Sequence, residues 1–190
     1  MTTTTGNLRE DIAYVRAAAE RADAASIPSI YVVWAVISLC GFALADFVDD
    51  GRWVGRFWAV AGPTGFAISA WLGYRAGRHS GQGSGRIGAR WGAHWLAFLA
   101  AGALGAVLVA AGHLTWSAFG SLVVLLLALS YFHAGLYLDR RMLAVGVVLG
   151  ACYLVTLLIP GYQWTLAGIL VAGALVWQAV LGARTRDAAR

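Results

Sequence analysis

Six long apolar stretches occupy the chain between Pro28 and Leu181, and short links join them. A helix needs about 20 apolar residues to cross a hydrocarbon core of about 30 Å, and each stretch is close to that length. The sequence is 60% hydrophobic and only 12% charged. A soluble domain of this size would then expose far more apolar surface than such domains tolerate. The pattern therefore predicts an all-α membrane protein with six transmembrane helices.

The expected bundle covers residues 28–183, between an N-terminal segment and a short cytoplasmic tail, residues 184–190. Its helix boundaries follow from the ends of the apolar stretches and from Trp and Tyr residues, which favour the membrane–water interface. The expected helices span about 28–48, 53–74, 90–111, 114–138, 141–159 and 162–181.

The N-terminal segment, residues 1–27, carries a helical pattern that is not a membrane span. Asn7 and Glu10 form a capping-box pattern, and apolar residues such as Ile12 recur along one helical face. Its charges nearly cancel, whereas a membrane-surface helix usually has an excess of basic residues. We therefore expect a short amphipathic cytoplasmic helix that contacts a protein partner or a second copy of the chain through residues 8–24. A solvated stub that leads into the membrane is the alternative.

All 14 Lys and Arg residues of this chain are arginines, and nearly all of them are predicted to lie on one side of the membrane. One face, around the link after the first predicted helix, would carry only Arg52 and Arg56. The opposite face would carry Arg9, Arg16, Arg21, Arg75, Arg78, Arg86, Arg90, Arg140, Arg141, Arg184, Arg186 and Arg190. Cytoplasmic loops carry the excess of basic residues, so both termini should be cytoplasmic. We expect a multi-pass protein of a bacterial-type cytoplasmic (inner) membrane. The basic balance then marks membrane boundaries, and no binding of nucleic acid is expected.

A proline in the second predicted helix marks a candidate solute path. Pro63 should kink that helix and free a backbone carbonyl near the midplane, and broken helices form substrate sites in some transporters. Pro63, Thr64 and Ser69 are therefore candidates for a solute path, with a kink for packing alone as the alternative. The first outer link should also bring Asp46 close to Arg56. That pair would be an ion pair between two helices or a filter at the mouth of the path.

Two histidines are candidates for binding a cofactor. The third and fourth predicted helices join through a tight turn near His113, so residues whose numbers sum to about 226 should lie at equal depth. His94 and His133 then share one height, where they could ligate a haem from opposite sides or line a quinone pocket. Ordinary interfacial histidines are the alternative. No metal site is expected, because neither cysteine reaches that depth and Asp139 is the one carboxylate nearby.

Small residues four apart predict where the helices touch, because they let two helix backbones approach closely. Such close packing is needed in lipid, where no hydrophobic effect drives helices together. Such strips contain Gly65, Ser69, Gly73 and Gly77; Ala97, Ala101 and Gly105; Gly146 and Gly150; and Gly168 and Ala172. The longest link, residues 75–89, is predicted as a flexible basic loop beside anionic lipid. Residues 83–88 match the sequence of a dinucleotide-binding motif, but no α/β unit is expected around them, so no nucleotide site is expected.

The positions of the polar and charged residues argue against two classes of function, enzymes and ion-coupled carriers. Ser121 and His133 lie near opposite ends of one predicted helix, too far apart for a nucleophile and its base, and we expect no enzyme activity. Ion-coupled carriers place ionisable groups near the midplane, whereas the charges of this chain lie near helix ends. Two hypotheses lead: a non-enzymatic structural or accessory membrane protein, and a passive channel or facilitator for a small neutral solute. A haem- or quinone-binding redox subunit that uses His94 and His133 is the third.

Overall fold

Six long helices make up almost all of the computed structural model, which describes residues 11–12, 14, 27–80, 85–159 and 161–187. Their bounds are α2 (Pro28–Phe47), α3 (Gly51–Ser80), α4 (Gly85–Ala110), α5 (Trp116–Tyr137), α6 (Met142–Leu158) and α7 (Gln163–Asp187). Each lies on one of the predicted apolar stretches. The prediction of an all-α chain is therefore confirmed.

Local sequence explains several of the helix ends. Pro28 occupies the first turn of α2, where its missing N–H costs no hydrogen bond. Thr115 caps α5, because its hydroxyl accepts a hydrogen bond from the backbone N–H of Ala118 at 3.2 Å. Gly112, with φ 76°, lies in the turn between α4 and α5, and Gly161, with φ 100°, lies between α6 and α7. These left-handed backbone angles favour glycine.

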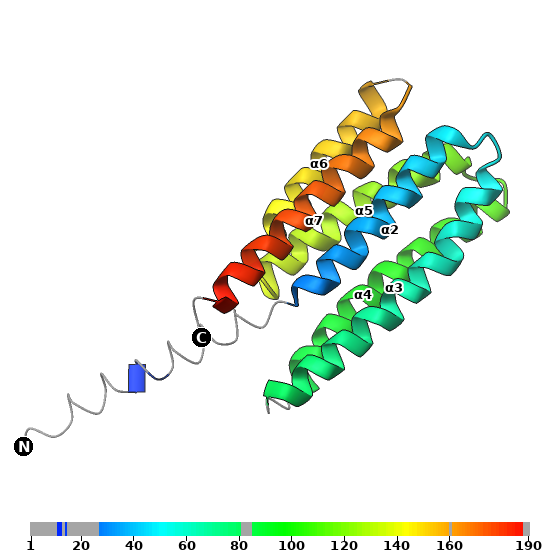
Figure 1. Ribbon diagram of the computed structural model, residues 1–190. Coiled ribbons are helices and arrows are strands. Elements are labelled where there is room, and N and C mark those ends of the chain that lie inside the picture. Colours follow the sequence, from blue (N-terminus) through cyan, green and yellow to red (C-terminus); the bar gives the residue numbers. More distant parts are fainter. Residues whose placement is uncertain (1–10, 13, 15–26, 81–84, 160, 188–190) are drawn as a thin grey trace, which may run out of the picture.

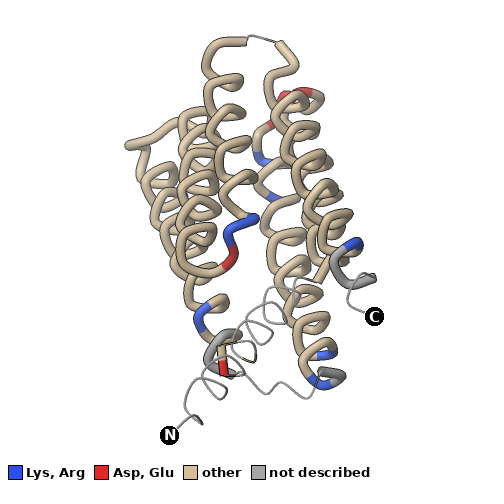
Figure 2. Tube along the Cα trace, turned by 90° about the vertical axis from the view of Figure 1, so that its left-hand side faces the viewer, with Lys and Arg blue, Asp and Glu red and all other residues tan. Residues whose placement is uncertain are grey.

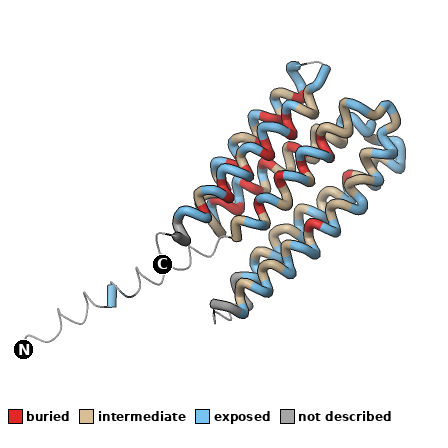
Figure 3. The backbone as a smooth tube through the Cα atoms, in the orientation of Figure 1, coloured by how far each residue is buried: buried red, intermediate tan, exposed pale blue. Residues whose placement is uncertain are grey.

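The helices run alternately up and down, so that the start of α2 and the end of α7 lie at the same end of the molecule (Figure 1). Four of them form a core: α2 packs along α7, α5 along α6, and α6 against α7. Among the described residues, the buried hydrophobic ones come from these four helices. Figure 3 shows most buried positions there and only isolated ones on the outer pair of helices, at Gly65 and Gly105. The other two helices lie outside the core, with α3 on α2 and α4 on α5.

Glycines mark several of the closest helix contacts. A Cβ added at Gly146 of α6 would lie 2.7 Å from the backbone nitrogen of Phe132 in α5, and one added at Gly168 of α7 would lie 3.0 Å from Cβ of Phe42 in α2. Gly65 and Gly105 also face side chains of a neighbouring helix. The prediction is wrong at Gly73, Gly77 and Gly150, because an added Cβ there would meet no atom within 4 Å. These positions face away from the neighbouring helices.

The predicted depth register of α4 and α5 is confirmed. The rings of Trp95 and Tyr131 lie 5.1 Å apart between centroids, and Gly105 lies against the ring of Phe119. In both pairs the two residue numbers sum to about 226, as a tight antiparallel turn near His113 requires.

The long basic loop predicted over residues 75–89 is wrong. Helix α3 continues without a break through Pro63 to Ser80, and α4 already begins at Gly85. Only residues 81–84 separate the two helices, and they lie outside the described residues. A helix satisfies the backbone N–H and C=O groups that a loop would leave to water or lipid. This gain outweighs the cost of about 1 kcal/mol for each glycine in a helix.

Four helices of the described chain are long and apolar enough to cross a membrane: α2, α5, most of α4 (Gly88–Ala110) and most of α7 (Gln163–Arg184). Helix α6 is apolar but shorter, with 17 residues. Helix α3 has arginines near both ends and a lower mean hydropathy. The composition and length of these helices indicate a membrane protein. Of the predicted N-terminal helix, residues 8–24, only Asp11, Ile12 and Tyr14 are described, and the rest lies outside the described residues.

Candidate functional sites

Charged residues gather at the two ends of the bundle (Figure 2). The end where α2 begins carries Arg75, Arg78, Arg90, Arg140, Arg141 and Arg184. The end where α2 finishes carries Arg52, Arg56, Asp46, Asp49 and Asp50. The described arginines thus follow the predicted sorting by end. Arg86 and Arg186 lie at the start of α4 and the end of α7, and the remaining four, Arg9, Arg16, Arg21 and Arg190, lie outside the described residues.

The carboxylate of Asp46, near the end of α2, caps helix α7 across the bundle. It accepts hydrogen bonds from the backbone N–H groups of Thr165 at 2.6 Å and Trp164 at 3.4 Å. The first turn of α7 has no acidic residue of its own, so Asp46 supplies the negative charge that a helix N-terminus favours. The predicted ion pair between Asp46 and Arg56 is therefore wrong. The free N–H groups of α7 compete successfully for the carboxylate, because they lie on the helix that packs most extensively on α2.

Arg52 and Arg56, in the first two turns of α3, have local partners. The guanidinium of Arg56 lies 4.9 Å from the ring centroid of Trp53, a cation–π distance. Arg52 forms an ion pair with Asp50, with 3.0 Å between Nε and Oδ2. The hydrogen bonds from Arg52 lower the pKa of Asp50 below its ordinary value. Both side chains of this ion pair are exposed, so it adds little to stability.

An aromatic cluster surrounds the capped end of α7. Phe42 of α2 stacks on Trp164 of α7, with ring centroids 6.2 Å apart and planes 5° apart. The same Phe42 ring meets Trp58 of α3 edge-on, at 5.8 Å. This cluster joins three helices near the end of α2, where Asp46 is only partly exposed. The hydrogen bonds of Asp46 are consequently stronger than they would be in open water.

The residues predicted to line a solute path have four different surroundings. Pro63 and Thr64 lie on the exposed side of α3, and the hydroxyl of Thr64 donates to the carbonyl of Val60 in the same helix at 2.7 Å. Ser69 accepts a hydrogen bond from the indole N–H of Trp34 in α2 at 3.0 Å, so it helps to hold α3 on the core. Asp46 binds α7, and Arg56 lies over Trp53. The structure does not bring these five candidates to one cavity.

The two candidate cofactor ligands differ in burial. Nε2 of His94 is buried and has no hydrogen-bond partner, and its ring lies edge-on to Trp95 at 5.2 Å. His133 is exposed, on the side of α5 away from its buried residues Tyr131 and Ala134. No group of three His, Cys, Asp or Glu residues that could hold a metal occurs in the described part of the chain. A haem or quinone between His94 and His133 stays a prediction.

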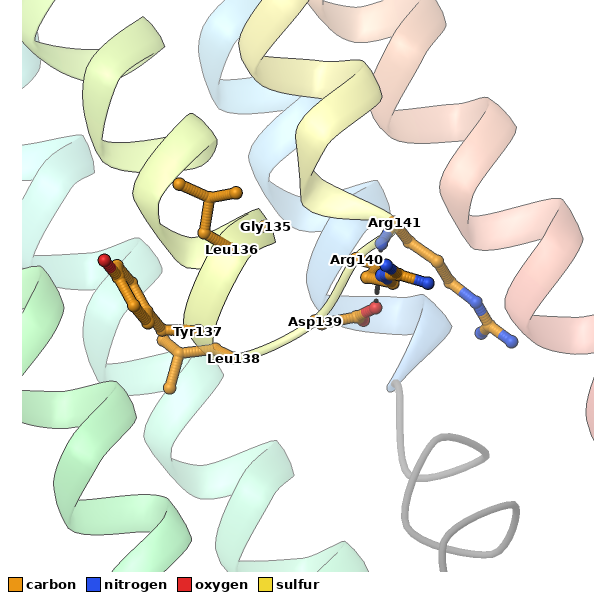
Figure 4. A pocket seen from close by; sticks show the side chains of 7 residues that line it. All are labelled: Gly135, Leu136, Tyr137, Leu138, Asp139, Arg140 and Arg141. Atoms are coloured by element: carbon orange, nitrogen blue, oxygen red, sulfur yellow. Dashed lines mark hydrogen bonds between the residues drawn. The ribbon is translucent and has the colours of Figure 1, made fainter.

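Two hollows lie on the surface of the core, both beside helix α6. One, of about 230 Å³, is formed by the turn between α5 and α6, residues 135–141 (Figure 4). The other is a groove of about 380 Å³ between α6 and α7. It contains Gln178, a residue that the sequence analysis missed although a glutamine within an apolar span is a signal of function.

Comparison with known proteins assigns no family. The chain matches no family model, and neither curated proteins nor solved structures give a match. The class of the protein therefore comes from its own helices: it is a helical protein with four apolar helices long enough to span a membrane. Any narrower function has to be argued from its residues.

Proposed function

We propose that this chain is a non-enzymatic structural or accessory protein of a bacterial-type cytoplasmic membrane. It crosses the membrane six times, with both termini in the cytoplasm, and its outlying helices α3 and α4 contact a partner helix. The N-terminal segment, residues 8–24, is a second expected contact with a protein partner. The observation that carries the proposal is the set of glycines on α3 and α4 that no neighbouring helix covers.

Each outlying helix has one glycine that is covered by the bundle and others that are open. Gly65 of α3 and Gly105 of α4 face side chains of the core helices α2 and α5. An added Cβ at Gly73 of α3, or at Gly92 or Gly102 of α4, would meet no atom within 4 Å. In lipid, a glycine face favours association because it lets a second helix approach closely. Open glycines on helices held at one edge therefore support a partner helix there.

The interior of the core supports a structural protein over a passive channel for a small neutral solute. Its buried polar side chains, among the described residues, are Ser38, Thr156 and Gln178. The hydroxyl of Thr156 donates to the carbonyl of Tyr153 in its own helix at 2.8 Å. A solute path needs polar groups that point into a continuous space, and the hollows described above lie on the outer surface. The channel and the redox subunit remain the second and third hypotheses.

One purification separates these hypotheses. The protein is extracted from native membranes in mild detergent, and its mass in solution and its absorption spectrum are recorded. We expect a complex of defined stoichiometry that contains a second copy or a partner subunit. Gly73→Leu combined with Gly92→Leu should reduce it to a monomer, whereas Gly150→Leu, at another open glycine on α6, should leave it intact. A colourless monomer that carries solute flux in vesicles would overturn this proposal and support the channel hypothesis. A Soret band would support the redox subunit.

A further inference from the structure

The groove between α6 and α7 has the shape and lining of a site for a lipid chain. It lies on the outer side of the core, and its volume of about 380 Å³ is in the range of small-ligand sites. Its lining includes Ala144 and Val148 of α6 and Leu170, Gly173 and Trp177 of α7. An added Cβ at Gly173 would meet no atom within 4 Å, so this glycine keeps the groove open rather than bringing two helices together.

The groove also holds a buried acceptor that the protein leaves unused. Gln178 is only 4% exposed. Its Nε2 donates to the carbonyl of Arg141 at 3.1 Å, whereas its Oε1 is buried and has no hydrogen-bond partner. A buried polar atom without a partner costs free energy. An occupant of the groove that offers a hydrogen-bond donor at this height would remove that cost.

Two arginines lie near the end of the groove where α6 begins. Arg141 directly precedes α6, and its side chain extends toward α7 (Figure 4). Arg184 follows Trp177 by about two turns of α7 and so lies on the same side of that helix. The one carboxylate at this turn, Asp139, accepts a hydrogen bond from the backbone N–H of Arg141 at 3.0 Å. Basic pockets between helices on the cytoplasmic side are typical sites for anionic lipid headgroups.

We propose that this groove binds one anionic phospholipid with a hydroxyl-bearing headgroup, of the phosphatidylglycerol type. Its acyl chain lies along the apolar lining, and its phosphate lies beside Arg141 and Arg184. A headgroup hydroxyl, held near the depth of the phosphate, donates to Oε1 of Gln178. The inference rests on the membrane placement in the proposed function, but it does not depend on a partner at α3 and α4.

The test uses the full-length protein, purified in mild detergent and placed in lipid nanodiscs. The discs contain phosphatidylcholine alone or phosphatidylcholine with phosphatidylglycerol, and native mass spectrometry identifies the lipid that stays bound. We expect the wild type to retain one phosphatidylglycerol. Gly173→Leu, which fills the groove without a clash, should lose it, and Gly150→Leu is the matched control at an open glycine outside the groove. Arg184→Gln should weaken the retention of phosphatidylglycerol about fivefold, because each basic residue near an anionic lipid surface contributes about 1 kcal/mol of attraction. The control for charge is Arg78→Gln, on α3.

Equal retention of phosphatidylglycerol by Gly173→Leu and Gly150→Leu would overturn the proposal. So would a change in oligomeric mass of Gly173→Leu without loss of lipid, because a helix would then occupy the groove. Failure of the wild-type chain to be recovered from membranes would instead count against its proposed membrane placement. A monomer that retains phosphatidylglycerol would count against the partner at α3 and α4 while supporting the lipid site.

Discussion

Replacing Asp46 with alanine should weaken the whole bundle, because this carboxylate joins the end of α2 to the start of α7. The change removes both acceptors at the backbone N–H groups of Trp164 and Thr165. No acidic residue in the first turn of α7 can replace them. The loss falls on the contact between α2 and α7, the most extensive helix pair of the core.

The size of the effect follows from the geometry of the cap. Loss of an N-cap costs about 1 kcal/mol and up to about 2 kcal/mol in proteins, and a hydrogen bond to a charged group contributes about 1.5–3 kcal/mol. The bond from Thr165 is short, at 2.6 Å, whereas that from Trp164 is long, at 3.4 Å, so the first carries most of the effect. We expect Asp46→Ala to lower the free energy of unfolding by about 2 kcal/mol. Asp46→Asn keeps one acceptor oxygen without the charge and should lose about 1 kcal/mol.

The assay is unfolding in mild-detergent micelles by added denaturing detergent, followed by tryptophan fluorescence. Arg56→Gln is the informative control. It removes the residue that the sequence pairs with Asp46, but in the structure its guanidinium lies over the exposed ring of Trp53. We expect Arg56→Gln to change the free energy of unfolding by less than about 0.5 kcal/mol. If it destabilises the protein as much as Asp46→Ala does, the ion pair exists and the cap of α7 is not the reason.

Two further predictions concern packing and topology. Gly146→Leu should greatly reduce the yield of folded protein, because its side chain would strike the backbone of α5, whereas Gly150→Leu should be tolerated; equal yields in a folding assay would remove the packing argument. In a cysteine-free background, a single cysteine at position 113 should react with an impermeant reagent added outside intact cells, and one at position 140 should not. The reverse pattern would invert the proposed topology.

The sequence by itself determined the helices and the register of neighbouring pairs. Apolar length places α2 and α5 within two residues of their observed bounds, and α4 and α7 within six, because a membrane requires a fixed length of hydrogen-bonded helix. The tight turn near His113 likewise determines that Trp95 lies at the depth of Tyr131. Both results depend only on residues that are close in the chain, which is why sequence reasoning reaches them.

Only the tertiary structure decided which helix closes the bundle and which faces it covers. Asp46 finds its partners 118 and 119 residues away in the chain, and no local pattern distinguishes α7 from α3 as the neighbour that takes this carboxylate. Spacing alone likewise could not tell Gly146, which meets α5, from Gly150, which is open. The unused Oε1 of Gln178 becomes visible only once α6 and α7 are packed together. A helix hairpin constrains depth but not rotation, and rotation about the helix axis decides which side chains meet.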